Sequence, residues 1–240
     1  MVIIWTPLNT SGWNHELESN TDWLDKRISI LNKYTIPSLS NQSDKDFLYF
    51  IEVREDTIDY IKPRLNIGEI NVKFISREKC NNWGTPEHTT WSRSIESIKQ
   101  YVNTDIFFDV RLNSDDAYHY KFISTLKSIK LKKDTEVIIP RVGYYWYMKD
   151  NVVVKRKHKS PPFYALIYNT KKYLNGFKYF LPGGHLSVST LKHISINNPM
   201  WCWLVHDSNQ KVIRKGSYPD YNKFERVNNS VLKDFFRLNI

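Results

Sequence analysis

The sequence predicts an α/β fold in which helices flank a mostly parallel central sheet, with a β-hairpin in the second half. Two observations support this prediction. Residues 1–130 alternate short apolar runs with amphipathic segments, which is the pattern of a doubly wound sheet. After residue 130 the pattern changes to strand, tight turn and strand, which indicates a hairpin. We expect the two halves, 1–130 and 131–240, to share one sheet within one continuous domain.

Each element of the first half follows from local periodicity and its boundary residues. The first helix can be capped by Asn20 or Thr21, carries apolar residues at helical spacing, and has Pro37 near its end. Strands are expected at residues 1–5, 46–56, 71–76 and 104–112. Further helices are expected at residues 87–103 and 117–130.

The second half is expected to be richer in strands. Residues 136–159 read as two strands joined by a turn around Lys149, Asp150 and Asn151. Residues 161–169 and 200–209 read as further strands, and residues 185–195 and 229–240 as helices.

Composition bounds the class of protein. The two cysteines argue against a disulfide scaffold or a zinc site. The N-terminus lacks the pattern of a signal peptide, and no window is apolar enough to span a membrane. We therefore expect a cytoplasmic protein, in the host cytoplasm if the protein is viral. Residues 1–120 hold 13 Lys/Arg and 18 Asp/Glu, whereas residues 121–240 hold 22 and 7. This asymmetry indicates either an anionic partner for the second half or a surface of solvated lysines.

The stretch RLNSDDA, residues 111–117, ends an apolar strand with two adjacent carboxylates, Asp115 and Asp116. Adjacent like charges disfavour ionisation, so a positive group is expected beside them. That group is either a Lys or Arg of the chain, such as Arg111, or a divalent metal, for which hard oxygen ligands at a strand end are suited. A purely structural alternative is that Asp115 caps the next helix and Asp116 lies in its first turn. Neither a Walker A sequence nor a GxGxxG motif is present.

Several segments, in this order, resemble the putative rhamnosyl transferase family of GT-A fold glycosyltransferases. They are residues 22–56, RLNSDDA with its flanks, SPPFYALIY, and PGGHLSVS followed by MWCWLVHDSN. The resemblance implies transfer of a sugar from a nucleotide-sugar donor to a hydroxyl acceptor, with Mn²⁺ or Mg²⁺ as cofactor. It also implies that 1–130 is the nucleotide-sugar-binding half and 131–240 the acceptor-binding half. The donor sugar, a hexose or a deoxyhexose, is left open.

The resemblance also implies site residues. Asp115 would be the leading metal ligand of a DxD-like motif, with Asp116 in support, and Asn113 stands where the family usually has Asp. His185 and His206 are candidate metal ligands, because many GT-A enzymes complete the metal site with a C-terminal histidine. Asp207 is the candidate general base, with Asp116 as its rival. The other candidate donor-binding residues are Thr6 and Glu52 at strand ends and the arginines Arg27, Arg93 and Arg111.

The acceptor side is expected to combine aromatic and basic residues. Tyr145 and Trp146 lie on a predicted strand where one face would be core and the other could stack a sugar ring. The basic residues Lys155, Arg156, Lys157 and Lys159 follow on the hairpin.

Three functions remain open from the sequence. The acceptor is a glycan or surface polysaccharide, or it is a hydroxymethylated base in DNA, which the basic second half would favour. The third alternative is a non-catalytic carbohydrate- or nucleic-acid-binding module on the same fold.

Overall fold

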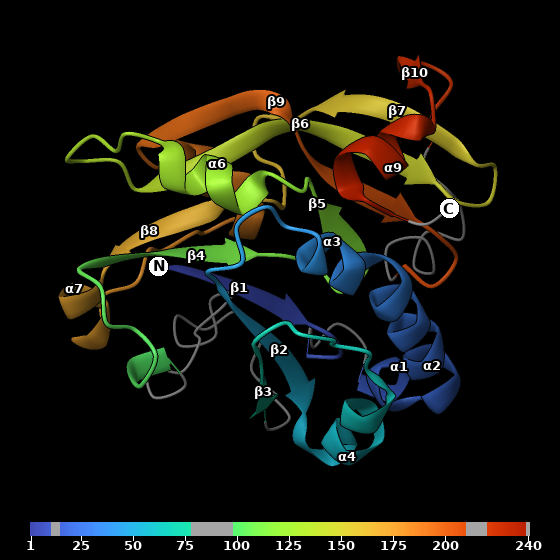
Figure 1. Cartoon of the computed structure of the whole chain (residues 1–240), viewed down its shortest axis with the longest axis horizontal. Helices are drawn as coiled ribbons and strands as arrows, with labels where there is room; N and C mark the ends of the chain where they lie inside the picture. Colours follow the sequence, from blue (N-terminus) through green and yellow to red (C-terminus); the bar gives the residue numbers. More distant parts are fainter. Residues whose placement is uncertain (11–14, 78–97, 210–219, 239–240) are drawn as a thin grey trace.

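A computed structural model describes residues 1–10, 15–77, 98–209 and 220–238. Within these ranges the chain forms a single ten-stranded mixed sheet that includes strands from both halves (Figure 1). The main path runs β10-β7-β6-β8-β4-β1-β2-β3, and β9 joins β6 and β5 beside that path. The strands are β1 (Val2–Pro7), β2 (Leu48–Arg54), β3 (Val72–Arg77), β4 (Ile106–Arg111), β5 (Asp116–Tyr118), β6 (Val137–Tyr147), β7 (Val152–Lys157), β8 (Ala165–Asn169), β9 (His193–Val205) and β10 (Arg226–Val227).

The helices are short and lie around the sheet. Figure 1 shows α3 beside β5, α1 and α2 next to each other below α3, and α9 beside β6 and β7. The α-helices are α1 (His15–Ser19), α2 (Thr21–Ile30), α3 (Ile36–Ser40), α4 (Ile58–Ile61), α6 (Phe122–Ser128), α7 (Thr170–Leu174) and α9 (Ser230–Phe236). A π-helix, η1 (Leu31–Thr35), and the 3₁₀-helices η2 (Glu55–Thr57), η3 (Lys62–Arg64) and η5 (Gly184–Thr190) complete the set. None of the described helices combines the length and the apolar character needed to cross a lipid bilayer.

The parallel part of the sheet confirms the α/β prediction. Strands β3, β2, β1 and β4 are neighbours and run parallel to one another. Their apolar side chains face both ways because alternate residues of a strand point to opposite faces. Val2 and Ile4 of β1 enter one core cluster, whereas Ile3 and Trp5 enter another. A sheet covered on both faces explains why these strands read as continuous apolar runs.

The second half extends the sheet with antiparallel strands. Strand β8 pairs antiparallel with β4 and β6, and β6 and β7 form the predicted hairpin. Asn151, in its turn, has a positive φ of 50°, which Asn tolerates better than most residues. Strand β9 runs parallel to β6 and antiparallel to β5. The two halves thus share one sheet, as the sequence predicted.

The first helical segment is longer than α2 alone. Asn20 caps α2 by accepting a hydrogen bond from the backbone N–H of Trp23 at 3.0 Å. The segment continues through η1 and α3, and the backbone N–H of Ile36 bonds to the carbonyl of Leu31, five residues earlier. Pro37 cannot donate a backbone hydrogen bond, so it fits the first turn of α3 after this wider turn.

Two helix predictions were wrong at their boundaries or in type. The expected helix 117–130 begins only at Phe122. Asp116–Tyr118 is strand β5 instead, because pairing with β9 buries Ala117 and Tyr118 completely. Residues 185–195 form η5 and the start of β9, where His193 pairs with Val137. The expected helix 87–103 falls largely outside the described residues.

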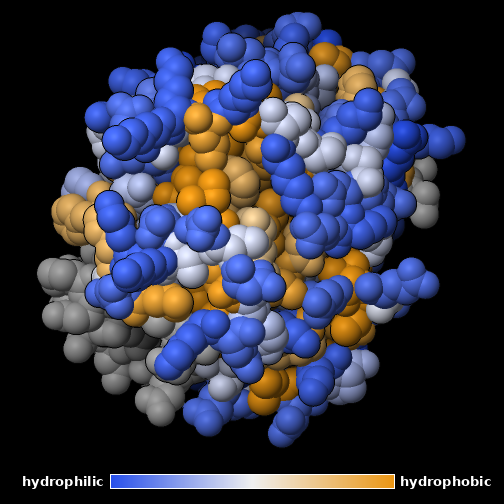
Figure 2. Space-filling model, turned by 60° about the vertical axis from the view of Figure 1, so that its left-hand side comes forward, coloured by the Kyte–Doolittle hydropathy of each residue, from blue (hydrophilic) through white to orange (hydrophobic). Residues whose placement is uncertain are grey.

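The surface is mixed. On the face shown in Figure 2, hydrophilic residues surround an exposed apolar area. In the described part of the chain, the large apolar side chains that stay exposed include Phe177, Phe180 and Leu186, in the segment that follows α7.

Candidate functional site

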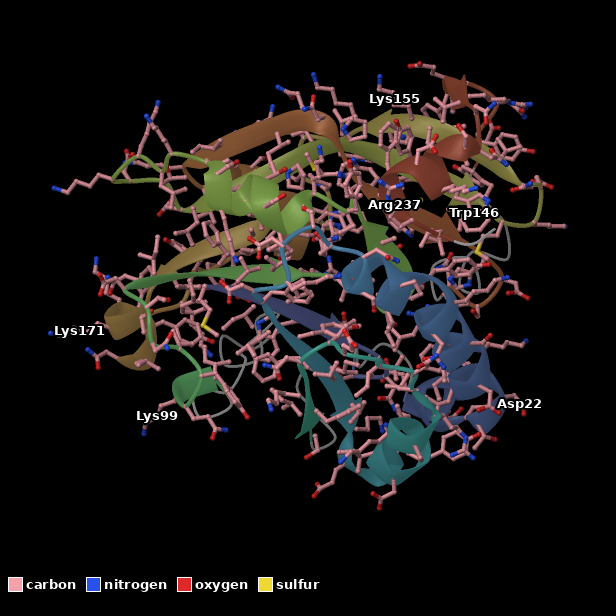
Figure 3. All side chains as sticks on the ribbon, viewed as in Figure 1. Asp22, Lys99, Trp146, Lys155, Lys171 and Arg237 are labelled. Carbon is pink, nitrogen blue, oxygen red and sulfur yellow. The ribbon has the colours of Figure 1, made fainter. Side chains whose placement is uncertain are left out.

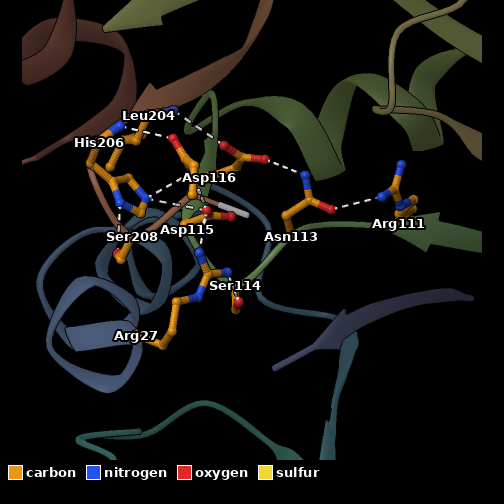
Figure 4. Close-up of polar contacts among 10 residues, drawn as sticks. Arg27, Arg111, Asn113, Ser114, Asp115, Asp116, Leu204, His206 and Ser208 are labelled. Atoms are coloured by element: carbon orange, nitrogen blue, oxygen red, sulfur yellow. Dashed lines mark hydrogen bonds and ion pairs between the residues drawn. The ribbon is translucent and has the colours of Figure 1, made fainter. Parts of the chain in front are cut away.

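A polar cluster forms where the segment between β4 and β5 meets helix α2 and the turn after β9 (Figure 4). We call it the Asp115 cluster; it consists of Arg27, Ser114, Asp115, His206, Ser208 and Asn209. All six side chains belong to buried residues. Helix α2 contributes the arginine, the segment after β4 contributes Ser114 and Asp115, and the turn after β9 contributes the rest.

Arg27 is the positive group that the adjacent carboxylates require. Its Nη1 forms a salt bridge with Asp115 Oδ2, and its Nη2 donates to Ser114 Oγ. The side chains of Arg27 and Asp115 are each only 8% exposed, so the pair is shielded from solvent. The suggestion that Arg111 pairs with Asp115 was wrong, because Arg111 Nη2 donates to Asn113 Oδ1 at 2.9 Å instead.

Two residues from the turn after β9 also contact Asp115. Asn209 Nδ2 donates to Asp115 Oδ2 at 2.6 Å, and His206 Nε2 lies 3.2 Å from the same oxygen. Ser208 Oγ lies 2.8 Å from Nδ1 of His206, so both nitrogens of the imidazole ring have a hydrogen-bond partner. The backbone N–H of His206 donates to Asn209 Oδ1 at 2.8 Å, so the turn holds its own shape. Sequence reasoning placed His206 near the acidic pair and missed Asn209, although Asn209 ends the same HDSN stretch.

The cluster keeps Asp115 ionised. Burial alone would raise the pKa of the Asp115 carboxyl, but the charge of Arg27 and the hydrogen bond from His206 outweigh it. The pKa of Asp115 is therefore held below its ordinary range. One negative charge and one permanent positive charge neutralise each other within the cluster.

Asp116 faces a different environment. It is completely buried, and both of its oxygens accept hydrogen bonds from neutral groups. Asn113 Nδ2 donates to Oδ2 at 2.6 Å, and the backbone N–H of Leu204 donates to Oδ1 at 3.2 Å. Burial and the nearby charge of Asp115 raise the pKa of Asp116 well above its ordinary value. The structural alternative, with Asp115 as helix cap and Asp116 in the first turn, was wrong because β5 follows.

Asp116 lies on a sheet face rich in aromatic rings, which we call the Asp116 face. It consists of Asp116, Gly143, Tyr145, Arg156, Trp201 and Trp203. Paired residues of antiparallel strands share a face, and Asp116 pairs with Trp203 while Gly143 pairs with Arg156. The ring centroids of Tyr145 and Trp203 lie 5.0 Å apart, and the Arg156 guanidinium lies 5.1 Å from the Tyr145 ring.

The candidate acceptor residues divide between two faces. Trp146 packs on the opposite face, where its ring contacts Tyr34 edge-on at 5.2 Å and its Nε1 donates to Asn151 Oδ1 at 3.2 Å. Lys155 and Lys157 are exposed and pair with residues of that same opposite face. Figure 3 shows Lys155 pointing outward at the edge of the sheet and Trp146 beside α9. Lys159 is exposed beyond the end of β7.

The other candidates are not members of the Asp115 cluster, although Asp207 stands between its members His206 and Ser208 in the chain. Thr6 and Glu52 are buried at the ends of β1 and β2. His185 belongs to η5, and Asp207 is exposed in the turn after β9. Arg93 lies outside the described residues. The structure thus brings together Arg27, Asp115 and His206 from the predicted set.

The expected divalent metal does not fit this arrangement. In the described ranges, no group of three His, Cys, Asp or Glu side chains is spaced to hold a metal ion. Asp115 Oδ2 is taken by three donors, and both oxygens of Asp116 accept hydrogen bonds. The guanidinium of Arg27 already places a cation beside Asp115 Oδ2.

Comparison with solved structures finds distant neighbours. HddC from Yersinia pseudotuberculosis is 15% identical with a TM-score of 0.46, over 90% of this chain and 97% of that chain. S. aureus TarS is 12% identical with a TM-score of 0.46, over 86% of this chain and 37% of that chain. The glycosyltransferase GlyE of Streptococcus pneumoniae is 12% identical with a TM-score of 0.39, over 82% of this chain and 45% of that chain. The chain therefore spans less than half the length of these TarS and GlyE chains.

No curated protein matches the chain. A family model described as "Putative rhamnosyl transferase" matches residues 15–214. This match covers most of the chain and includes every member of the Asp115 cluster and of the Asp116 face. The chain belongs to the putative rhamnosyl transferase family.

Proposed function

We propose that the protein transfers a hexose or deoxyhexose from a nucleotide-sugar donor to a hydroxyl group of a glycan acceptor. The observation that carries this proposal is the family match over 15–214, which contains the whole Asp115 cluster. The cluster lies at the carboxyl edge of β4, and ligands of open α/β sheets bind beyond the carboxyl ends of parallel strands. A GT-A-like donor site at this edge accounts for polar residues at the end of buried strands.

In the proposed reaction, the acceptor oxygen attacks the anomeric carbon of the donor sugar. The bond from that carbon to the diphosphate breaks, the nucleoside diphosphate leaves with the electron pair, and the acceptor proton passes to a general base. A base must come within hydrogen-bond reach of the acceptor. Asp207 is exposed, whereas Asp116 is enclosed and already accepts two hydrogen bonds. We therefore assign the base role to Asp207 and a positioning role to Asp116.

The Asp116 face is the proposed acceptor side. Trp203 is only partly buried, and its ring offers flat apolar surface for a sugar ring. Arg156, also partly buried, supplies a charged hydrogen-bond donor on the same face. The basic residues Lys155 and Lys157 belong to the other face of the sheet. They do not continue the Asp116 face into one basic surface, so the arrangement favours a glycan over nucleic acid.

The test is a screen of nucleotide sugars. Purified protein is heated with UDP-, GDP- and dTDP-linked hexoses and deoxyhexoses, and the correct donor raises the melting temperature because it binds only the folded state. Release of nucleoside diphosphate from that donor is then measured for the parent protein and for Asp207→Asn. We expect the variant to bind the donor like the parent and to lose most turnover.

The outcomes separate the alternatives. Binding with no turnover in the parent, with any glycan acceptor supplied, would identify a binding module. Full turnover in Asp207→Asn would remove Asp207 from the base role. Failure of every nucleotide sugar to bind would overturn the proposed function itself.

A further inference from the structure

Arg27 supplies the positive charge beside Asp115 that the family resemblance would assign to a divalent metal. The guanidinium contacts both Ser114 and Asp115, the two central residues of the DxD-like stretch. Arg is always protonated in proteins, so this cation is a permanent part of the chain. A divalent ion would have to displace it to reach Asp115 Oδ2.

Most of the atoms that a metal would use already have hydrogen-bond partners. Asp115 Oδ2 accepts from Asn209 at 2.6 Å in addition to the Arg27 salt bridge. Asn113, at the position where the family usually has Asp, uses its amide carbonyl to accept from Arg111 at 2.9 Å and its amide nitrogen to donate to Asp116. The ring of His206 is held between Asp115 and Ser208.

Several contacts hold the side chain of Arg27 in position. Helix α2 is capped by Asn20, and its residues Trp23 and Leu24 are buried against the core. The Arg27 guanidinium carbon lies 5.5 Å from the centre of the Trp23 ring, within range of a cation–π contact. Its Nε is buried and has no hydrogen-bond partner among the described residues. The guanidinium is therefore enclosed and held in one position.

We propose that the donor diphosphate binds beside this stretch without a divalent cation, because Arg27 already neutralises the carboxylate that a metal would neutralise in a DxD enzyme. The proposal rests on the proposed function for the identity of the donor. The absence of a metal site in this described stretch does not depend on the proposed function, because it concerns only whether RLNSDDA can bind a metal ion.

The first test measures Mn²⁺ directly. Electron paramagnetic resonance of Mn²⁺ titrated with the parent protein reports binding without any nucleotide. We expect the free-ion signal to remain, since no pair of free carboxylates is offered to the ion. Stoichiometric loss of the signal at micromolar protein would overturn the proposal.

The second test measures the nucleotide. UDP, GDP and dTDP are titrated by calorimetry, once after treatment with EDTA and once with added Mn²⁺. We expect the affinity of whichever nucleotide binds to change by less than about twofold between the two conditions. An affinity that rises tenfold or more with Mn²⁺, about 1.4 kcal/mol, would overturn the proposal. If no nucleotide binds in either condition, the proposed function fails, and the Mn²⁺ titration alone decides the present inference.

A variant designed to gain Mn²⁺ binding tests whether Arg27 is what excludes the ion. The double substitution Arg27→Met and Asn113→Asp removes the resident cation and adds a charged oxygen ligand. We expect this variant to bind Mn²⁺, and we expect Lys192→Met, which removes an exposed cation elsewhere, to behave like the parent. A folded double variant that still fails to bind Mn²⁺ would show that Arg27 is not what excludes the ion.

Discussion

Asp115 and Asp116 are consecutive buried residues, yet their surroundings favour opposite protonation states of the carboxyl group. The Asp115 cluster keeps its carboxylate charged by pairing it with Arg27. The Asp116 face surrounds its carboxyl with aromatic rings and neutral donors, which favours the protonated form. The difference shows how one chain holds two neighbouring acids without placing two negative charges side by side.

The largest expected effect comes from removing the cation of the Asp115 cluster. Arg27→Ala leaves Asp115 buried without a charged partner, and such a loss costs about 3–5 kcal/mol in the free energy of unfolding. Urea denaturation measures it. The control is Lys192→Ala, which breaks the 3.0 Å ion pair with Asp134, where both side chains are more than half exposed. That control should cost about 0–1 kcal/mol, and equal losses in the two variants would contradict a distinct role for the cluster.

A second variant tests the packing of the Asp116 face. A Cβ added at Gly143 would lie 2.1 Å from a ring carbon of Trp201, so Trp201 or the strand must move. We expect Gly143→Ala to lower the free energy of unfolding by about 1–3 kcal/mol. Gly183→Ala is the control, because its new Cβ would meet nothing closer than 3.7 Å. If the two alanine variants were equally stable, the face would be more adaptable than its packing indicates.

The two acids should also differ in how they couple stability to pH. The pKa of Asp115 is lowered in the folded state, so its contribution is present above the ordinary Asp pKa and is lost as the pH falls. The pKa of Asp116 is raised, so the unfolded chain releases a proton first and stability falls as the pH rises above the ordinary value.

Asn substitutions separate these contributions. Asp115→Asn should reduce the loss of stability in acid, whereas Asp116→Asn should reduce the loss on going from acid to neutral pH. The free energy of unfolding, measured by urea denaturation across this range, checks both slopes. Slopes that change in the same direction in the two variants would refute the contrast between the two regions.

The smallest expected effect concerns one hydroxyl on the Asp116 face. Tyr145 Oη lies 3.0 Å from His158 Nε2, and Tyr145→Phe should cost about 0.5–1.5 kcal/mol by losing this hydrogen bond. Tyr144→Phe is the matched control on the opposite face, since within the described part of the chain the Tyr144 hydroxyl makes no hydrogen bond. It should change the free energy of unfolding by no more than about 0.5 kcal/mol.

The sequence predicted those features that depend on short-range pattern. The parallel strands, the hairpin with its turn near Asn151, and the strand that delivers Asp115 are all confirmed. Helix 117–130 was predicted too early because its residues suit a helix, whereas pairing with β9 draws Asp116–Tyr118 into the sheet. Tertiary packing overrode local preference there.

The partner of Asp115 was not predictable in the same way. The adjacent carboxylates required a positive group, and Arg111, at the end of β4, was the nearest candidate in the sequence. Arg27 is 88 positions from Asp115, and its proximity depends on how α2 packs beside the sheet edge. Alternation on β6 does place Tyr145 and Trp146 on opposite faces, but it does not say which face Asp116 shares. That requires the β5–β9 and β6–β9 registers.

The connectivity of the Asp115 cluster determines when the site can form during folding. Asp115 contacts Arg27 across 88 positions and Asn209 across 94 positions, and contacts of such long range form slowly because large loops must close first. During synthesis, Arg27 and Asp115 emerge long before Asn209. Strand β5 and the hydrogen bond from Leu204 to Asp116 also wait for β9. Closure of the site therefore accompanies the entry of β5 and β9 into the sheet, and the appearance of activity in a refolding experiment would report that step.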